Sequence, residues 1–363
     1  MKAAVCHEHG KPLLIQDVHI AEPKGTQVKI KIGACAICHS DIHYAEGAWK
    51  GPLPAVYGHE AAGVVVEVGA DVKRLKEGDR VIVTLIRSCG RCFYCDQDTP
   101  TLCGTAVALD SGDILTDTRG NPVIQGMKTG AFAEYVVVDA SQVAVLPGDI
   151  RLDAASLLAC GVITGVGALV NTAKVYPGAS VVVVGVGGVG LNTVQGARLC
   201  GAARIIALDT EDEKLDVARQ LGATHGMNAN EENARKHILE ITDGRGADFI
   251  FVTVGARTAM DQSYQYMRRG GEVILVGMTA RGVRSEFLPL NLVSSTQTIR
   301  GSFMGQTRLS VDIPWLIEHY RQGRLKLGEL ISNRYCLDEI NDAIKNTLGG
   351  KSIRNVLVMD DSL

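Results

Sequence analysis

The sequence has no apolar run long enough to cross a bilayer. Its longest apolar stretch near the middle, residues 179–186, is far shorter than the roughly 20 residues that a membrane-spanning helix needs. Residues 1–11 are mixed and polar, so they lack the apolar core of a signal peptide. These absences lead us to expect a cytoplasmic protein.

The sequence also lacks a strong excess of charge of either sign. The net charge is −3, and there is neither a basic stripe nor a polybasic run, which argues against nucleic acid and a membrane surface as partners. Internal repeats and low-complexity segments are absent too. With 363 residues, 46% of them hydrophobic, the chain can bury the cores of two globular domains.

Cysteine, in contrast, is plentiful, and its distribution indicates metal binding. Ten cysteines would suit a disulfide scaffold only in a much shorter secreted chain. Four of them follow the spacing Cys-x2-Cys-x2-Cys-x7-Cys and can offer four thiolates to one tetrahedral zinc ion at about 2.3 Å. These four are Cys89, Cys92, Cys95 and Cys103.

The scattered cysteines Cys6, Cys35, Cys200 and Cys336 are most simply interpreted as free thiols, buried as cysteines commonly are. Cys35 and Cys38 also form a Cys-x-x-Cys pair. A redox disulfide is the less favoured interpretation of that pair, because no thioredoxin-like unit surrounds it.

Two patterns of secondary structure divide the chain. Up to about residue 160, alternation and Gly/Pro punctuation predict short strands and turns. We expect strands at 28–32, 62–68, 80–85, 132–139 and 142–146, and a long surface loop at 104–128.

From about residue 180, predicted strands alternate with predicted helices, the pattern of parallel βαβ units in a doubly wound sheet. The strands are expected at 180–184, 204–208, 248–254, 272–276 and 298–303, and the helices at 191–199, 213–221, 231–242 and 259–269. Two further helices, at 311–322 and 337–348, and a closing strand at 353–359 could pack back on the first domain.

Residues 181–190 form a glycine-rich segment, V-V-V-V-G-V-G-G-V-G. Gly185, Gly187 and Gly190 fit G-x-G-x-x-G, in which the glycines permit a tight turn, close approach of a pyrophosphate and close helix packing. The segment follows a predicted strand and opens a predicted helix, whose N-terminus would face the phosphates. This context favours a dinucleotide site over a tight turn that binds nothing.

Asp209 indicates which dinucleotide binds. It lies 19 residues after Gly190, at the end of the next predicted strand, where a carboxylate accepts hydrogen bonds from the adenosine ribose hydroxyls. A 2′-phosphate would meet this negative charge, and no arginine follows directly in residues 210–213. We therefore predict NAD rather than NADP. Lys214 either touches the ribose edge or is a helix-surface lysine.

A second, open metal site can be built from Cys38, His43, His59 and Cys160. Two thiolates and one neutral imidazole cancel the charge of Zn²⁺, and three protein ligands leave one position for water or substrate. A zinc ion in such a site lowers the pKa of a bound alcohol and polarises a bound aldehyde. Together with the dinucleotide, this combination indicates redox chemistry on a small alcohol or aldehyde.

At this point the sequence resembles the zinc-containing alcohol dehydrogenases of the medium-chain dehydrogenase/reductase superfamily, over nearly its whole length. The resemblance rests on G-A-C-A-I-C-H-S-D-I-H (33–43), G-H-E (58–60), the four-cysteine segment, A-C-G-V-I-T-G (159–165), V-G-V-G-G-V-G (184–190) and G-K-S-I-R (350–354).

The resemblance implies an α/β fold with two domains. Residues 1–164 and 304–363 would form a GroES-like, β-rich catalytic domain with a structural zinc lobe at 89–103. Residues 165–303 would form a Rossmann NAD-binding domain with a doubly wound parallel sheet. It also implies a homodimer or homotetramer, because the strand at 298–303 falls where the family pairs its Rossmann sheets edge to edge.

The resemblance further implies roles for individual residues. Cys38, His59 and Cys160 would bind the catalytic zinc, and the four clustered cysteines the structural zinc. Ser40 would hydrogen-bond the substrate hydroxyl, and its proton would pass through the nicotinamide ribose to His43. The cofactor would contact His39, Thr164, Gly185, Gly187, Gly188, Val189, Gly190, Asp209, Lys214, Val276, Met278 and Arg354.

Two acidic residues are expected beside the catalytic zinc. Asp41 would orient His59, because a zinc-bound histidine generally donates its second ring N–H to a carboxylate or carbonyl. Glu60 would lie behind the metal.

The substrate pocket departs from the class III, glutathione-dependent branch that the motif set otherwise resembles. Trp49 and Gly51 stand where that class has acidic residues, and His43 where it has tyrosine. Because Trp49, Leu85 and Met278 are large and apolar, we expect a medium-sized or aromatic primary alcohol. Trp49 can equally well serve only to pack a loop.

Three alternatives remain at this stage. One is thiol-dependent formaldehyde oxidation. Another is a zinc-free double-bond reductase of the same superfamily, which the intact Cys38, His59 and Cys160 set argues against. The third is a non-enzymatic, NAD-binding structural or redox-sensing zinc protein, which would leave the open site unexplained.

Overall fold

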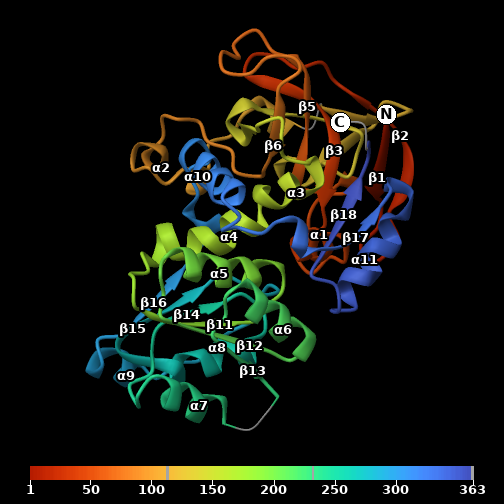
Figure 1. The fold of residues 1–363 in the computed structure, drawn as a ribbon. Helices are drawn as coiled ribbons and strands as arrows, with labels where there is room; N and C mark the ends of the chain where they lie inside the picture. Colours follow the sequence, from red (N-terminus) through yellow and green to blue (C-terminus); the bar gives the residue numbers. More distant parts are fainter. Residues whose placement is uncertain (112–113, 231–232, 361–363) are drawn as a thin grey trace. The chain divides into compact units, whose positions relative to one another are not determined.

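The strands of the computed structural model fall into two groups, one in each of two units (Figure 1). The structure describes residues 1–111, 114–230 and 233–360. Unit 1 comprises the described residues of Met1–Cys160, Arg308–Glu318 and Leu327–Leu363, and unit 2 comprises those of Gly161–Thr307 and His319–Lys326. Strands and helices occur together, so the predicted α/β class is confirmed.

A closed barrel of short strands forms one part of unit 1. Its strand order is β1-β2-β7-β8-β4, and β4 closes it by pairing with β1. The strands are β1 (Lys2–Cys6), β2 (Leu14–Ile20), β4 (Ala55–Val56), β7 (Leu115–Asp117) and β8 (Pro122–Gln125).

A mixed sheet forms the other part of unit 1, in the order β10-β6-β5-β3-β18-β17, with β9 also paired to β3. Its strands are β3 (Gln27–Ala36), β5 (Glu60–Val68), β6 (Arg80–Val83), β9 (Tyr135–Asp139), β10 (Val143–Val145), β17 (Ile331–Tyr335) and β18 (Arg354–Val358). The helices of this unit are α1 (His39–Ala45), α2 (Phe93–Asp96), α3 (Leu152–Ser156), α11 (Ile340–Leu348) and the first part of α10 (Leu309–Arg321).

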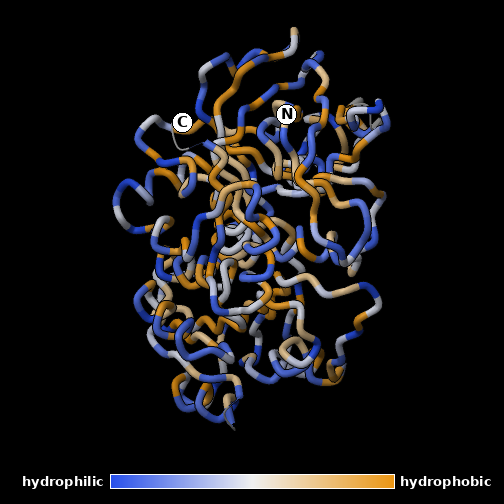
Figure 2. Tube along the Cα trace, turned by 90° about the vertical axis from the view of Figure 1, so that its right-hand side faces the viewer, coloured by the Kyte–Doolittle hydropathy of each residue, from blue (hydrophilic) through white to orange (hydrophobic). Residues whose placement is uncertain are grey.

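Strand β3 pairs with β5, β9 and β18, and its alternate side chains are apolar. Val28, Ile30 and Ile32 are buried in the core of the unit, while Lys29 and Lys31 on the opposite face are half-buried. Figure 2 shows hydrophobic and hydrophilic residues interspersed along the trace of the chain. Strand β18 comes from the C-terminal part of the chain and pairs antiparallel with β3, so the tail completes the first unit's sheet.

The loop prediction for 104–128 is wrong in part. Strands β7 and β8 lie inside this stretch and pair antiparallel as a hairpin. Asp117 accepts hydrogen bonds from the N–H groups of Arg119 and Asn121, both at 2.8 Å, and these bonds fix the turn. Leu109, Ile114, Leu115 and Val123 are buried in the core of the unit, and they anchor a segment whose composition is otherwise that of a loop. Residues 112–113 lie outside the described part.

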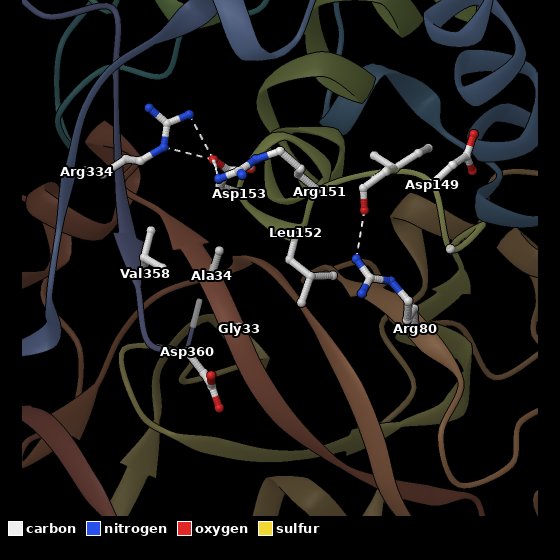
Figure 3. Close-up of a pocket in the computed structure, with 12 residues that line it drawn as sticks. Gly33, Ala34, Arg80, Asp149, Arg151, Leu152, Asp153, Arg334, Val358 and Asp360 are labelled. Carbon is white, nitrogen blue, oxygen red and sulfur yellow. Dashed lines mark hydrogen bonds and ion pairs between the residues drawn. The ribbon is translucent and has the colours of Figure 1, made fainter. Parts of the chain in front are cut away.

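A polar cavity of about 420 Å³ lies between α3 and the sheet in unit 1 (Figure 3). Arg151 and Arg334 point toward the buried Asp153, which accepts from them at 3.1 and 2.8 Å, and Arg80 donates to the carbonyl of Ile150 at 2.8 Å. None of the residues predicted to bind metal, cofactor or substrate lines this cavity. The ion pairs connect α3 to β17 and have a structural role.

Unit 2 is built on a parallel sheet in the order β13-β12-β11-β14-β15-β16. Its strands are β11 (Ser180–Val184), β12 (Arg204–Asp209), β13 (His225–Asn228), β14 (Ala247–Val252), β15 (Met267–Leu275) and β16 (Thr298–Gly301). Its helices are α4 (Gly161–Gly167), α5 (Gly188–Leu199), α6 (Asp212–Leu221), α7 (Ala234–Ile241), α8 (Arg257–Ser263) and α9 (Pro289–Ser294).

Helices cover both faces of this sheet, as predicted for a doubly wound fold. Ile238 of α7 and Met260 of α8 share a buried cluster with Val182 and Val184 of β11, while α5 contacts the sheet from the other side (Figure 1). The strand order reverses at β11 and β14. In open α/β sheets, the carboxyl ends of the strands at such a reversal form the usual ligand site.

The helix predicted at 259–269 is wrong at its end. Helix α8 stops at Ser263, a single 3₁₀ turn follows at Tyr264–Tyr266, and β15 already begins at Met267. The pairing of Met267 with Ala247 of β14 outweighs the local helical pattern. The predicted helix at 231–242 begins outside the described residues; α7 is described from Ala234.

Among the described residues, no single helix is both long and apolar enough to cross a membrane. The bent pair Leu152–Ala159 and Gly161–Ala173 meets that criterion only when taken together, on length and composition alone.

Asp248 ties together the starts of three strands in unit 2. Its carboxylate accepts hydrogen bonds from the backbone N–H and the hydroxyl of Ser180, from the hydroxyl of Tyr176 and from Nε of Arg268, all within 2.7 Å. Burial alone would raise the pKa of Asp248. The hydrogen bonds outweigh burial and hold this pKa well below its usual range.

We predict that Asp248→Asn lowers the free energy of unfolding at pH 7 by about 1–3 kcal/mol, because an amide cannot accept all four bonds. The depressed pKa stabilises the fold above pH about 4, and this contribution fades as pH falls. The difference between wild type and variant should therefore shrink in acid, as measured by urea unfolding.

Asp243→Asn is the matched control. This aspartate is exposed and pairs with Arg204 at 2.9 Å on the surface, where an ion pair contributes little. Equal stability of wild type and Asp248→Asn at pH 7 would contradict the proposed role of Asp248.

Candidate metal centres and dinucleotide site

Four buried side chains with metal-binding atoms converge in unit 1. Cys38, His59, Glu60 and Cys160 each offer one ligand atom, and all four atoms lie within 4.8 Å of one another. The three residues predicted to hold the catalytic zinc are thus brought together from positions 122 residues apart (160 − 38). Their roles as ligands stay predictions.

Local structure explains how two of these residues are presented. Cys38 lies two residues after the end of β3 and is the N-cap of α1, so its side chain lies at a helix terminus. His59 follows Gly58, which has φ +94°; a Cβ there would lie 2.6 Å from the backbone N of Phe132. Only glycine fits this close approach, and the chain then delivers His59 directly before β5.

Asp41 orients His59. Its Oδ1 lies 2.9 Å from Nδ1 of His59 and also accepts the N–H of Gly58 at 2.9 Å, while Oδ2 accepts the N–H of Cys38 at 3.1 Å. Because a carboxylate can only accept, Nδ1 carries a proton toward Asp41, which leaves Nε2 as the ring atom that a metal can bind.

Nε2 of His59 is buried and has no hydrogen-bond partner among the described residues. A buried polar atom of this kind is costly unless something satisfies it. It lies in a group with two thiols, a donor set that suits Zn²⁺. The residues present therefore fit a zinc ion.

The two thiols have opposite pKa shifts. The pKa of Cys38 is held well below its ordinary value, chiefly by a hydrogen bond with Cys160, and the same contact together with burial raises the pKa of Cys160. The pair thus favours one thiolate, a negative charge suited to a cation.

Glu60 and Arg354 form a buried ion pair beside these ligands. Oε1 of Glu60 lies 2.5 Å from Nη2 of Arg354, and both side chains are almost wholly inaccessible. Burial raises the pKa of Glu60 to about 7, although Arg354 opposes this shift. Arg354 was expected at the cofactor pyrophosphate; in this structure it contacts Glu60, and the pyrophosphate role stays a prediction.

The predicted proton-relay and pocket residues lie on or near α1. Ser40 and His43 are three residues apart on that helix and so share one face. The rings of His43 and Trp49 have centroids 4.9 Å apart, and Trp49 is only 8% exposed. His39 is exposed at the start of the helix, and Leu85 follows β6 and is half-buried.

The four clustered cysteines form the second group. All four sulfur atoms lie within 4.8 Å of one another, with Cys92 at 3.6 Å from Cys95 and 3.8 Å from Cys103. The hydroxyl of Thr105 donates to Cys89 at 3.2 Å and is the first cause lowering the pKa of that thiol to about 6. Four thiols at this spacing fit a closed tetrahedral zinc site.

The glycine-rich segment of unit 2 joins β11 to α5. Gly187 is the N-cap of α5, Gly185 has φ +84°, and a Cβ on Gly190 would lie 1.9 Å from the carbonyl O of Gly185. A side chain at Gly190 would therefore prevent helix and turn from packing. Gly188 and Val189 form the first turn of α5, where free N–H groups can receive an anion.

Asp209 ends β12 and holds this turn. Its Oδ2 accepts the N–H of Val186 at 2.7 Å, and its Oδ1 accepts the N–H of Glu211 at 3.1 Å. Lys214 lies in the first turn of α6. The structure thus brings Asp209 against the glycine-rich turn at the sheet's carboxyl edge.

The remaining predicted cofactor residues also belong to unit 2. Val276 is buried and Met278 is 51% exposed, both directly after β15. Thr164 lies on α4, and its hydroxyl contacts the sulfur of Met304 at 3.7 Å.

The partner of Glu60 and the aromatic neighbours of Trp49 are not predicted from the sequence. A glutamate that opens the mostly apolar strand 60–68 signals a buried charge that needs a counterion. No local pattern identifies Arg354, 294 residues further on (354 − 60), as that counterion.

Comparison with known proteins agrees with this geometry. The chain matches the alcohol dehydrogenase GroES-like domain over residues 24–148 and the zinc-binding dehydrogenase domain over residues 188–321. It is 35% identical to alcohol dehydrogenase 1 of Pisum sativum, covering 99% of this chain and 97% of that protein.

Two further relatives bear on the substrate. S-(hydroxymethyl)glutathione dehydrogenase of Saccharomyces cerevisiae is 37% identical, over 99% of this chain and 96% of that protein. The crystal structure of benzyl alcohol dehydrogenase from Acinetobacter calcoaceticus superimposes with a TM-score of 0.92 at 31% identity, over 99% of each chain.

These similarities argue against the zinc-free reductase and the non-enzymatic zinc protein, and they agree with two zinc ions per chain and NAD as cofactors. The chain belongs to the zinc-containing alcohol dehydrogenases of the medium-chain dehydrogenase/reductase superfamily, and it is an NAD-dependent alcohol dehydrogenase.

Proposed function

We propose that this enzyme interconverts medium-sized or aromatic primary alcohols and their aldehydes at a zinc held by Cys38, His59 and Cys160. The observation that supports this site best is the buried, unpartnered Nε2 of His59 within reach of two thiols. Zinc bound there would act as a Lewis acid that lowers the pKa of an alcohol hydroxyl.

The chain's own groups then have distinct tasks. Asp41 keeps His59 in the tautomer that can bind a metal, through the 2.9 Å contact with Nδ1. Ser40 accepts a hydrogen bond from the substrate's hydroxyl and passes its own proton on, and His43, on the same helix face, takes up the relayed proton. Glu60 and Arg354 supply balancing charges behind the thiols.

We assign NAD to the carboxyl edge of the sheet in unit 2. There Asp209 binds the adenosine ribose and the first turn of α5 binds the pyrophosphate. The residues assigned to the cofactor are His39, Thr164, Gly185, Gly187, Gly188, Val189, Gly190, Asp209, Lys214, Val276, Met278 and Arg354. The corresponding domain limits are 1–164 with 304–363 for the catalytic domain and 165–303 for the NAD-binding domain.

The apolar residues assigned to the substrate pocket support a medium-sized or aromatic alcohol as substrate. Trp49 is held against His43, so an apolar ring adjoins the proposed relay. Leu85 is the other apolar residue assigned to this pocket, and Met278 is the apolar residue assigned beside the nicotinamide. Likeness to a benzyl alcohol dehydrogenase supports an aromatic alcohol.

A glutathione adduct of formaldehyde is the second candidate substrate. Likeness to S-(hydroxymethyl)glutathione dehydrogenase favours it. Against it, Trp49 and Gly51 stand where the glutathione-dependent class has acidic residues to grip the tripeptide.

One comparison of substrates tests the two. With NAD⁺, kcat/KM for benzyl alcohol or hexanol should exceed that for formaldehyde plus glutathione. The opposite order would replace our proposal with the glutathione-dependent activity. Cell fractionation would test the cytoplasmic location, which also stays a prediction.

Mutations should distinguish the roles of the two proposed zinc sites. Cys38→Ser should lower the zinc content from two ions per chain to one and reduce kcat/KM by more than about 100-fold, while NAD binding persists. Cys95→Ala should also remove one zinc ion, but mainly lower the thermal midpoint. Elemental analysis with calorimetry measures both effects. Full activity in Cys38→Ser would disprove the assignment of the catalytic site.

Asp209→Gly should raise the use of NADP relative to NAD, since it removes the charge that repels a 2′-phosphate. We expect the ratio of kcat/KM for NAD to that for NADP to fall by about tenfold or more. Asp216→Gly is the control, because Asp216 is an exposed carboxylate on α6 paired with Arg219. If this ratio is unchanged in Asp209→Gly, Asp209 does not determine the choice between NAD and NADP.

We further propose that two chains pair through unit 2. Strand β16 is the edge of the sheet, and α9 before it exposes Leu290 by 76% and Val293 by 80%. Such apolar exposure is typical of an interface. Leu290→Asp should therefore shift the protein toward monomers in sedimentation, whereas Val311→Asp, at a 51% exposed site on α10, should not. Identical sedimentation of wild type and Leu290→Asp would count against this interface.

A further inference from the structure

Four aromatic rings form a continuous contact series in unit 1. The His43 and Trp49 centroids are 4.9 Å apart at 44°, those of Tyr44 and Trp49 are 5.5 Å apart in an edge-to-face arrangement, and those of Tyr44 and Tyr57 are 5.8 Å apart and stacked. These separations are typical of favourable aromatic pairs. Tyr44 is therefore the link between Trp49 and a ring deeper in the protein.

The deep end of this series is fixed. Tyr57 is only 2% exposed, and a Cβ on Gly126 would lie 2.3 Å from its ring. The chain continues from Tyr57 through Gly58 to His59. Tyr57 is thus buried and closely packed, and it supports Tyr44, which stacks on it.

The backbone around Tyr44 is also held. Its carbonyl accepts the N–H of Gly47 at 3.1 Å and lies 3.1 Å from Nδ1 of His9. The N–H of Trp49 donates to the carbonyl of His43 at 3.2 Å, so the segment from 43 to 49 closes on itself. The indole can then change position only by turning about its own side-chain bonds, and the edge contact with Tyr44 opposes such turning.

We propose that Tyr44 is a positioning residue that sets the substrate specificity of the enzyme. It holds Trp49 against His43, and the position of Trp49 sets how far the apolar wall of the alcohol site extends. This inference rests on the proposed function for the choice of substrate. The placement of the indole by Tyr44 does not depend on that function.

Tyr57 supports Tyr44 through its aromatic ring, and its hydroxyl takes no part in this support. That oxygen is buried and has no hydrogen-bond partner among the described residues. Burial of the group raises its pKa, as expected for a phenol in apolar surroundings. Tyr57 thus acts as an apolar support for Tyr44.

The kinetic test compares benzyl alcohol with ethanol, which is too small to reach an aromatic wall. Tyr44→Ala should raise KM for benzyl alcohol by about tenfold, with a change of less than about threefold for ethanol and in kcat for either alcohol. Tyr44→Phe keeps the ring and should restore the wild-type KM ratio. An equal loss with both alcohols would mean a structural role only and would overturn the proposal.

A spectroscopic test needs no substrate. The chain has two tryptophans, so Trp315→Phe leaves Trp49 as the single emitter. In that background, Tyr44→Ala should shift the Trp49 emission to longer wavelength and speed its quenching by acrylamide. Tyr320→Ala is the matched control, since Tyr320 is a half-buried helical tyrosine outside the aromatic series. Unchanged Trp49 emission in Tyr44→Ala would overturn the proposal.

The two tests separate the possible failures. If Trp49 emission shifts while the wild type prefers formaldehyde plus glutathione, the substrate class is wrong and Tyr44 still positions the indole. If Tyr44→Ala does not fold, Tyr44→Leu keeps apolar volume without an aromatic edge. Tyr44→Leu should then give the same shift of Trp49 emission and the same selective rise in KM for benzyl alcohol. The absence of both effects would overturn the proposal.

Discussion

The contact between Asp41 and His59 is the interaction on which the metal centre depends. A carboxylate that is 1% exposed accepts bonds from Cys38, Gly58 and His59 at once. It thereby fixes the start of α1, the turn before β5 and the imidazole in one arrangement. Removing this carboxylate would leave three buried donors without acceptors, so the positions of Cys38 and His59 depend on it.

The two units divide the chemical tasks. The thiols and the imidazole belong to unit 1, and the glycine-rich turn with Asp209 belongs to unit 2. Cys160 ends the first segment of unit 1, and Gly161 begins unit 2 as the first residue of α4. Cys160, the proposed metal ligand, and Thr164, a residue assigned to the cofactor, are therefore only four positions apart in the chain.

The sequence predicted those features of the fold that are encoded locally. The run Val181–Val184 and the glycines after it could be assigned to a strand and a turn because each residue type has one favoured use there. Metal-ligand spacing in the four-cysteine lobe is equally local. The strands that close the barrel, and the pairing of Met267 with Ala247, depend on partners distant in sequence, and local patterns do not specify them.

The same distinction applies to the site. Cys38, His59 and Cys160 could be grouped from their chemistry, because two thiolates and one imidazole are a common set of zinc ligands. The contact of Arg354 with Glu60 could not, since either charge could have found another partner. The support of Trp49 by Tyr44 and Tyr57 was missed because aromatic packing leaves no fixed spacing in the sequence. Long-range pairs thus mark the limit of what the sequence predicts for this enzyme.

The large apolar side chains of the four-cysteine lobe, residues 89–103, are exposed rather than buried. Its short helix α2 exposes Phe93 by 72% and Tyr94 by 44%, and nearby Leu102 is 46% exposed. Burial of apolar side chains therefore contributes little to the stability of this segment. Binding of a zinc ion by the four cysteines would then provide most of the free energy that offsets the loss of chain entropy. Order in the lobe would then follow the supply of free metal ion in its surroundings, while the adjoining sheet keeps its shape by burial.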